Sequence, residues 1–125
     1  MVLDTSVILS IFFKEKHHEW AVNQMNIHAH ELRMSTVNLT EALIHLQDRQ
    51  PQLFNECEEQ LLYQGIRFVP PDVEQSKIAA KARIQFPLNL GDCFAFALAL
   101  QEDCPILTLD KDFRILNQVT IIHPF

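Results

Sequence analysis

Glycine is scarce in this sequence. Only Gly65 and Gly91 occur among 125 residues, whereas average usage of about 7% would give roughly nine. Neither glycine precedes a lysine, which excludes a Walker A loop, and two glycines cannot form the three-glycine fingerprint of dinucleotide-binding proteins. The segment Asp110-Lys111-Asp112 is followed by Phe113 and Arg114, without the turn glycine of an EF-hand. The chemistry of this chain must therefore come from its side chains.

Several sorting and cross-linking signals are also missing. The three cysteines, Cys57, Cys93 and Cys104, form no CxxC pair, and they fit reduced thiols in a cytosolic protein better than a disulfide framework. The longest apolar runs are far below the roughly 18 residues of a membrane helix. Met1 is followed by Val-Leu-Asp, without the basic start of a signal peptide. We therefore expect a single cytoplasmic domain over residues 1–125, with no membrane segment.

The chain is acidic. Ten Lys and Arg residues against sixteen Asp and Glu residues give a formal charge of −6. Taken alone, this charge counts against a polyanionic partner. The interpretation reverses if several acids lie together and hold divalent cations, because two bound ions would change −6 to −2.

Short apolar runs alternate with longer helical patterns. The runs predict strands at residues 1–3, 32–37, 66–69, 105–109 and 119–122. The helical patterns cover residues 8–13, 17–29, 39–49, 51–63, 72–86, opened by a capping box of Asp72 with Gln75, and 91–103. The last helix is apolar nearly all round, which predicts that it is buried. This alternation predicts an α/β fold, a three-layer α/β/α domain with a five-stranded parallel sheet.

Acidic residues stand where the predicted strands end. Asp4 directly follows the first strand, and Glu41 lies in the first turn of the helix after the second strand. Asp92 begins the apolar helix, and Asp110 follows the fourth strand with Asp112 two residues later. Ligands of parallel α/β sheets bind at the carboxyl ends of the strands. Clustered carboxylates repel one another unless a cation compensates them, and oxygen-only ligand sets suit Mg²⁺ or Mn²⁺.

Four segments resemble, in order, the motifs of the PIN domain family, and in particular its VapC-type toxins. The resemblance covers essentially the whole chain and is carried by residues 1–9, 35–43, 88–99 and 106–113. It implies a compact endoribonuclease that uses Mg²⁺ or Mn²⁺ and hydrolyses RNA with a metal-activated water. It also implies a VapB-type antitoxin that holds the enzyme inactive, and a homodimer.

The resemblance assigns roles to individual residues. It implies that Asp4, Glu41 and Asp92 are metal ligands and catalytic residues. The fourth acid matches either Asp110 or Asp112; we favour Asp110 as the ligand and leave Asp112 as a helper or helix cap. The hydroxyl residues at the same strand ends would hydrogen-bond the acids or metal-bound water, and these are Ser6 and Thr108.

Structural roles compete with these assignments. Asp4 could cap the helix that begins near Ser6, and Glu41 has the spacing of the partner of an Asn38 cap. A catalytically silent PIN-like binding module within a protein or RNA complex is therefore the alternative function. The apolar segment 8–13 should lie partly in the core, and an antitoxin or a second subunit would cover any exposed part.

Overall fold

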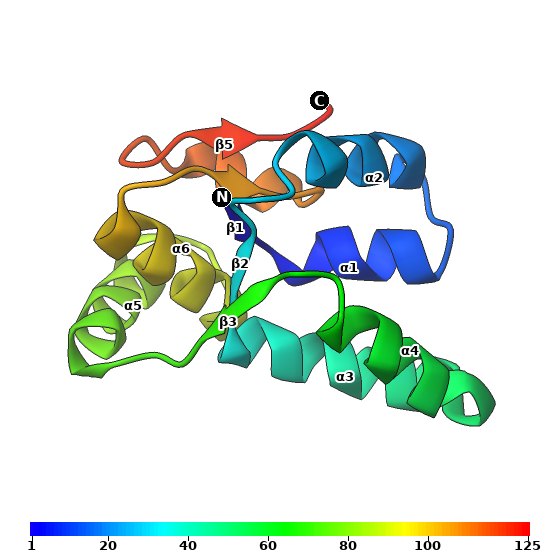
Figure 1. The fold of residues 1–125 in the computed structure, drawn as a ribbon. Helices are drawn as coiled ribbons and strands as arrows, with labels where there is room; N and C mark the ends of the chain where they lie inside the picture. The colour runs from blue at the N-terminus through cyan, green and yellow to red at the C-terminus, as the bar shows by residue number, and fades with distance from the viewer.

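A computed structural model describes residues 1–125 and contains one five-stranded sheet, with all neighbouring strands parallel in the order β3-β2-β1-β4-β5 (Figure 1). The predicted α/β class is confirmed. The strands are β1 (Val2–Leu3), β2 (Arg33–Ser35), β3 (Arg67–Val69), β4 (Ile106–Leu107) and β5 (Ile121–Ile122). The helices are α1 (Thr5–Phe12), α2 (His18–Ile27), α3 (Thr36–Arg49), α4 (Phe54–Leu62), α5 (Val73–Gln85) and α6 (Leu90–Glu102), with the short 3₁₀ helices η1 (Pro51–Leu53) and η2 (Lys111–Ile115).

Helices cover both faces of the sheet, as expected. Figure 1 shows α1 to α4 on one side of the strands and α5 and α6 on the other. Successive residues of a strand point to opposite faces, and the central strands follow this rule. Leu3 and Leu107 belong to the core under α1 to α4, whereas Val2 and Ile106 belong to the core under α5 and α6. The sheet thus separates two hydrophobic cores.

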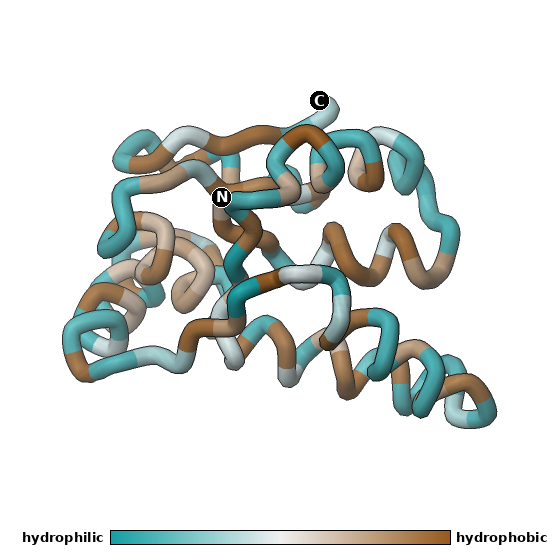
Figure 2. Tube along the Cα trace, in the orientation of Figure 1, coloured by the Kyte–Doolittle hydropathy of each residue, from teal (hydrophilic) through white to brown (hydrophobic).

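The helices differ in how apolar their surfaces are. Figure 2 shows brown and teal alternating along α3 and α4, as expected for helices with one face in solvent. In α6, residues 91–93 and 95–99 are buried, which confirms that this apolar helix lies inside the molecule. No helix has the length and apolar character that crossing a bilayer requires.

Several predicted boundaries were wrong, and local capping explains two of them. Helix α1 begins at Thr5 rather than residue 8, because Asp4 is its N-cap. Helix α3 begins at Thr36, where a strand was predicted, because the Ser35 hydroxyl accepts the Val37 N–H. Glu41 therefore lies in the second turn of α3, not in the first. Strand β4 has two residues rather than five.

The capping box predicted for α5 forms only in part. The Asp72 carboxylate accepts the Gln75 N–H at 2.8 Å, as the spacing predicted. The Gln75 side chain instead donates to Gln101 at 2.6 Å, near the end of α6. Gln101 also donates to the Asp72 carboxylate at 3.0 Å. The start of α5 is therefore tied to the end of α6, and the two helices run antiparallel.

A cluster of three charged residues lies at the end of the sheet where β2 and β3 begin. Arg33 and Arg67 are paired in the register of β2 and β3. Glu102, the last residue of α6, accepts from Arg33 at 2.7 Å and from Arg67 at 2.9 Å. Burial opposes ionisation of Glu102, but hydrogen bonds and charges of the two arginines outweigh it and hold its pKa below the usual range. One carboxylate thus bridges the arginines of two neighbouring strands.

Candidate active site

The acidic side chains meet at the carboxyl end of the sheet, where the strand order changes direction. The chain runs outward from β1 through β2 to β3, and then returns to the other side of β1 with β4 and β5. Such a switch point leaves a crevice between the two strands at which the direction changes, here β1 and β4. Asp4 follows β1 directly, and Asp110 follows β4 by three residues. The fold therefore brings together acids that are more than one hundred positions apart in the sequence.

Asp4 is held by hydroxyl groups. It is only 3% exposed, and its Oδ2 accepts from the Ser6 hydroxyl at 2.6 Å and from the Thr108 hydroxyl at 2.9 Å. Its Oδ2 also accepts the Ser6 N–H at a longer 3.4 Å, so Asp4 caps α1 as well as facing the site. Burial raises the pKa of Asp4, and the nearby Asp110 carboxylate adds to this effect.

Ser6 and Thr108 link the two central strands. The Ser6 hydroxyl accepts the Leu109 N–H at 2.9 Å, and the Thr108 hydroxyl accepts the Asp110 N–H at 2.9 Å. The structure thus places both hydroxyl residues in contact with Asp4 and with the chain that leads to Asp110. Thr108 is fully buried, so its position is fixed by packing as well as by hydrogen bonds.

Glu41 reaches the same site from α3. Its Oε1 accepts from the Thr5 hydroxyl at 2.9 Å and from the Asn38 amide at 3.0 Å. Asn38 also donates to the Gly91 carbonyl at 3.0 Å, so it joins α3 to α6. The interpretation of Asn38 and Glu41 as a capping pair was wrong, because Ser35 caps α3 and Asn38 lies within the helix.

Gly91 makes room for the Glu41 carboxylate. A Cβ atom at position 91 would collide with both oxygens of Glu41, so only glycine lets α6 approach this closely. The sequence predictions for the site did not include Gly91, Thr5 or Asn38. The signal for Gly91 was present, because it is one of two glycines in the chain and directly precedes Asp92. Thr5 and Asn38 carried no comparable signal.

Asp92 opens α6 and faces the other acids. Its Oδ2 accepts the Asn89 N–H at 3.2 Å, and the Asn89 side chain accepts the Asp92 N–H at 2.8 Å, which makes a complete capping box. Burial, together with the charges of Asp4, Asp110 and Glu41, raises the pKa of Asp92 to about 7. Because all three other acids contribute, the four carboxylates share one electrostatic environment.

Asp110 and Asp112 differ in position. Asp110 caps η2, and its Oδ1 accepts the Asp112 N–H at 2.9 Å. The Asp110 charge raises the pKa of both Asp4 and Asp92, whereas Asp112 is among the causes for neither. Asp112 is exposed on η2. The electrostatic contact with Asp4 and Asp92 therefore favours Asp110 over Asp112 as the fourth acid.

Each of the four carboxylates keeps one oxygen without a hydrogen bond. The protein's donors reach Oδ2 of Asp4, Oε1 of Glu41, Oδ2 of Asp92 and Oδ1 of Asp110. No Lys, Arg or His forms an ion pair with any of them. As the side chains stand, no group of three or more His, Cys, Asp or Glu residues is placed so that it could hold one metal ion. The donor set nevertheless fits a hard divalent cation in chemistry, since it offers oxygen atoms and uncompensated negative charge.

The crowded acids predict an unusual pH dependence for the metal-free protein. The Asp92 pKa is about 7 in the folded state and 3.8 for an unperturbed carboxyl, so the folded state binds the proton more tightly. The free energy of unfolding contributed by this proton is fully present below about pH 4 and is lost as the pH rises through 7. We expect a lower melting temperature in EDTA at pH 8 than at pH 5, and a smaller decrease in Asp92→Asn.

The control for this measurement is Asp48→Asn, an exposed position on α3. It should keep the wild-type decrease. Asp72 and Glu102 have lowered pKa values, so the stability that they contribute is lost only as the pH falls below about 4.5. Their effect therefore lies outside the range from pH 5 to pH 8. An equal decrease in wild type and Asp92→Asn would show that Asp92 ionises normally in the folded protein.

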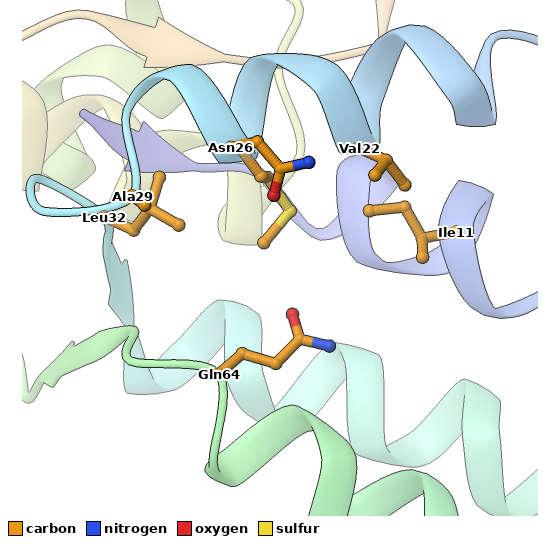
Figure 3. Close-up of a pocket in the computed structure, with 7 residues that line it drawn as sticks. Ile11, Val22, Asn26, Ala29, Leu32 and Gln64 are labelled. Atoms are coloured by element: carbon orange, nitrogen blue, oxygen red, sulfur yellow. The ribbon is translucent and has the colours of Figure 1, made fainter.

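A separate apolar pocket lies between the helices on the α1 to α4 side. Its volume is about 270 Å³, and Ile11 and Val22 line it together with Met25, Leu32 and Gln64. Figure 3 shows Ile11 and Val22 projecting from neighbouring helices above Gln64, which follows α4. The early apolar segment is thus partly in the core and partly on an open surface. That a partner covers this surface stays a prediction.

Comparison with known proteins finds one matching family model and several similar curated proteins. A model of the PIN domain matches residues 1–118. The curated protein Ribonuclease VapC42 of Mycobacterium tuberculosis is 29% identical over 123 residues, which cover 90% of this chain and 92% of that protein. Ribonuclease VapC28 of Mycobacterium tuberculosis is 27% identical over 122 residues, with coverage of 90% and 91%.

Solved structures share the same fold. VapBC2 from Rickettsia felis, bound to a DNA fragment from its promoter, superposes with a TM-score of 0.81 and 12% identity, covering 98% of this chain and 96% of the other. The sarcin-ricin loop cleaving toxin VapC20 of Mycobacterium tuberculosis gives a TM-score of 0.78 and 15% identity, with coverage of 91% and 92%. At these identities the comparison establishes the architecture.

Proposed function

This chain belongs to the PIN domain family, and on that premise we propose that it is a divalent-metal-dependent endoribonuclease, the toxin of a VapBC-type toxin–antitoxin pair. The observation that carries the proposal is the set of four carboxylates at the switch point. Each has one oxygen that accepts no hydrogen bond, and none has a cationic partner. The relatives named VapC ribonuclease, at 27–29% identity, support the same activity.

We assign the metal site to the four clustered acids, with Mg²⁺ or Mn²⁺ as the ion. When bound, such an ion supplies charge stabilisation at a phosphate and lowers the pKa of a water molecule. The chain's own residues fix the geometry. Ser6 and Thr108 hold one oxygen of Asp4, and Thr5 and Asn38 hold one oxygen of Glu41, so that the second oxygen of each carboxylate is left without a hydrogen bond. The acids assigned to the ion are Asp4, Glu41, Asp92 and Asp110.

The reaction that fits this site is hydrolysis of an RNA phosphodiester. Water attacks the phosphorus, the P–O3′ bond breaks, and the 3′ oxygen takes up a proton. The products carry a 5′-phosphate and a 3′-hydroxyl. Product-end analysis therefore separates this mechanism from cleavage by the RNA 2′-hydroxyl, which leaves a cyclic phosphate.

We further propose that a VapB-type antitoxin and a second copy of the chain are its partners. Solved structures with the same fold include VapBC2 from Rickettsia felis and VapBC from Salmonella typhimurium, both determined with DNA. The open apolar pocket beside Ile11 and Val22 is a surface that a protein partner would bury.

The decisive experiment is cleavage of a panel of fluorescence-quenched RNAs by the purified chain without a partner. We expect cleavage with Mg²⁺ or Mn²⁺, none in EDTA, and 5′-phosphate ends on the products. Calorimetric titration with Mn²⁺ should show binding by the same preparation. Folded protein that neither cleaves the panel nor binds Mn²⁺ would instead be the catalytically silent binding module.

A further inference from the structure

A second pocket opens on the side of the acid cluster where Asp4 and Asp110 lie. Its volume is about 490 Å³, within the roughly 300–1,000 Å³ typical of small-ligand sites. Ser6 and Leu109 form the part nearest the acids, since the Ser6 hydroxyl bonds both Asp4 and the Leu109 N–H. Lys111, the neighbour of Asp110, also lines this pocket. A ligand in the pocket would therefore lie next to any phosphate bound at the acids.

The pocket is locally cationic in an acidic protein. Lys16 comes from the loop between α1 and α2, Lys111 comes from η2, and both line the pocket. Neither lysine forms an ion pair, although the chain carries a net charge of −6. Glu15 is the one acidic side chain in the lining, against the two lysines. Unpaired lysines beside a phosphodiester site provide contacts for the flanking phosphates.

An aromatic side chain completes the pocket. Phe125 lines it and is 42% exposed. The His17 ring meets Phe125 edge-on at 5.7 Å, His123 stacks on it at 5.6 Å, and the Lys111 ammonium lies 5.0 Å from its centroid. The Phe125 N–H also donates to the His123 ring at 3.1 Å. These contacts hold the ring in place while 42% of the residue stays exposed, and an exposed aromatic ring is a group on which a nucleobase can stack.

We propose that this pocket is a nucleotide subsite, in which Phe125 stacks with one RNA base while Lys16 and Lys111 contact the adjoining phosphates. The inference rests on the proposed function, because it places the nucleotide next to a scissile phosphate held at Asp4 and Asp110. The mixture of unpaired lysines and a partly exposed aromatic ring favours a nucleic acid over a protein. The apolar pocket around Ile11 and Val22 lacks both features.

Fluorescence anisotropy in Ca²⁺, with EDTA as a second condition, measures binding separately from Mg²⁺- or Mn²⁺-dependent cleavage. The probes are a labelled random-sequence RNA 12-mer and a labelled chain of equal length without bases. The variants are Phe125→Leu, Phe125→Trp, Lys16→Gln and Lys111→Gln. Lys77→Gln is the matched control. Lys77 does not line the pocket, and it pairs with Glu74 in α5.

We expect Phe125→Leu to weaken binding of the base-bearing RNA about fivefold to 100-fold, since stacking contributes roughly 1–3 kcal/mol per base. Phe125→Trp should bind like wild type, and binding of the chain without bases should not change. Lys16→Gln and Lys111→Gln should each reduce the slope of log K against log salt by about 0.7. Lys77→Gln should leave the slope unchanged.

The outcomes separate this subsite from the proposed activity. If wild type cleaves RNA but Phe125→Leu binds it normally, the subsite is wrong and the nuclease stands. If binding depends on Phe125 and the lysines but no metal supports cleavage, the subsite stands and the nuclease is wrong. Wild type that binds no RNA at all overturns the subsite, whatever the cleavage assay shows.

Discussion

Asp4→Asn is expected to lower metal-dependent RNA cleavage about 1,000-fold or more while leaving the fold intact. An ion held by carboxylates provides several kcal/mol of transition-state stabilisation, and each 1.36 kcal/mol is a factor of ten in rate. The Asn carbonyl can still accept from Ser6 and Thr108, which now donate to Oδ2 of Asp4. The charge is removed and the hydrogen bonds remain.

Stability should move in the opposite direction from activity. Asp4 is buried, and its pKa is raised by that burial, so the ionised carboxylate costs the metal-free protein free energy at pH 8. The melting temperature of Asp4→Asn in EDTA should therefore equal or exceed that of wild type. Adding Mn²⁺ should raise the melting temperature of wild type and of the control Asp48→Asn, but not that of Asp4→Asn.

Two results would contradict this assignment. One is metal-dependent cleavage by Asp4→Asn at the wild-type rate, which would remove Asp4 from the ion site. The other is marked destabilisation of Asp4→Asn in EDTA, because a repelling carboxylate cluster should relax when one charge is neutralised. The cleavage rate and the melting temperature are measured on the same purified protein, so loss of activity is distinguished from loss of folding.

Gly91→Ala is expected to reduce activity about 10- to 100-fold without unfolding the protein. The new Cβ would occupy the space of the Glu41 carboxylate, which must then leave the Thr5 and Asn38 donors. Misplaced supporting geometry at a metal site costs about this much in affinity or activity. The Glu41 side chain is flexible and can move, while alanine in a helix is favoured over glycine by roughly 0.5–1 kcal/mol.

A double-mutant cycle tests that mechanism. Glu41→Asp shortens the side chain by one methylene and leaves room for a Cβ at position 91. Combined with Gly91→Ala, it should give more activity than the product of the two single effects, because residues in contact are not additive. Mn²⁺ affinity, measured by titration, should weaken in Gly91→Ala. Strict additivity with unchanged Mn²⁺ affinity would mean that Gly91 serves only helix packing.

The layered fold could be predicted because its signal is local. Short apolar runs such as Val2–Leu3 and Ile106–Leu107 alternate with helical patterns, and that alternation alone implies a parallel sheet. The strand order β3-β2-β1-β4-β5 could not be predicted in the same way. It depends on which helix covers which face, and that choice is made by packing between residues far apart in the sequence.

The acids of the site were found from their places after the strands, whereas the groups that position them were not. Glu41 shows the difference. Its neighbour Asn38 looked like a helix cap, because Ser35 three residues earlier was assigned to a strand. Once Ser35 caps α3, Asn38 turns inward and binds both Glu41 and the Gly91 carbonyl. A shift of three residues in one helix start thus changes the role of a buried amide.

The cluster of three charged residues at the start of β2 and β3 has a consequence for the order in which the chain can assemble. Arg33 and Arg67 are paired in the register of β2 and β3, and like charges opposite each other destabilise strand pairing. Their shared carboxylate, Glu102, lies 35 positions beyond Arg67. During synthesis, β2 and β3 therefore emerge before the residue that pairs with their two arginines. The two arginines therefore gain their carboxylate only when α6 has docked, so a nascent chain that stops before α6 leaves the β2–β3 pair with two uncompensated like charges.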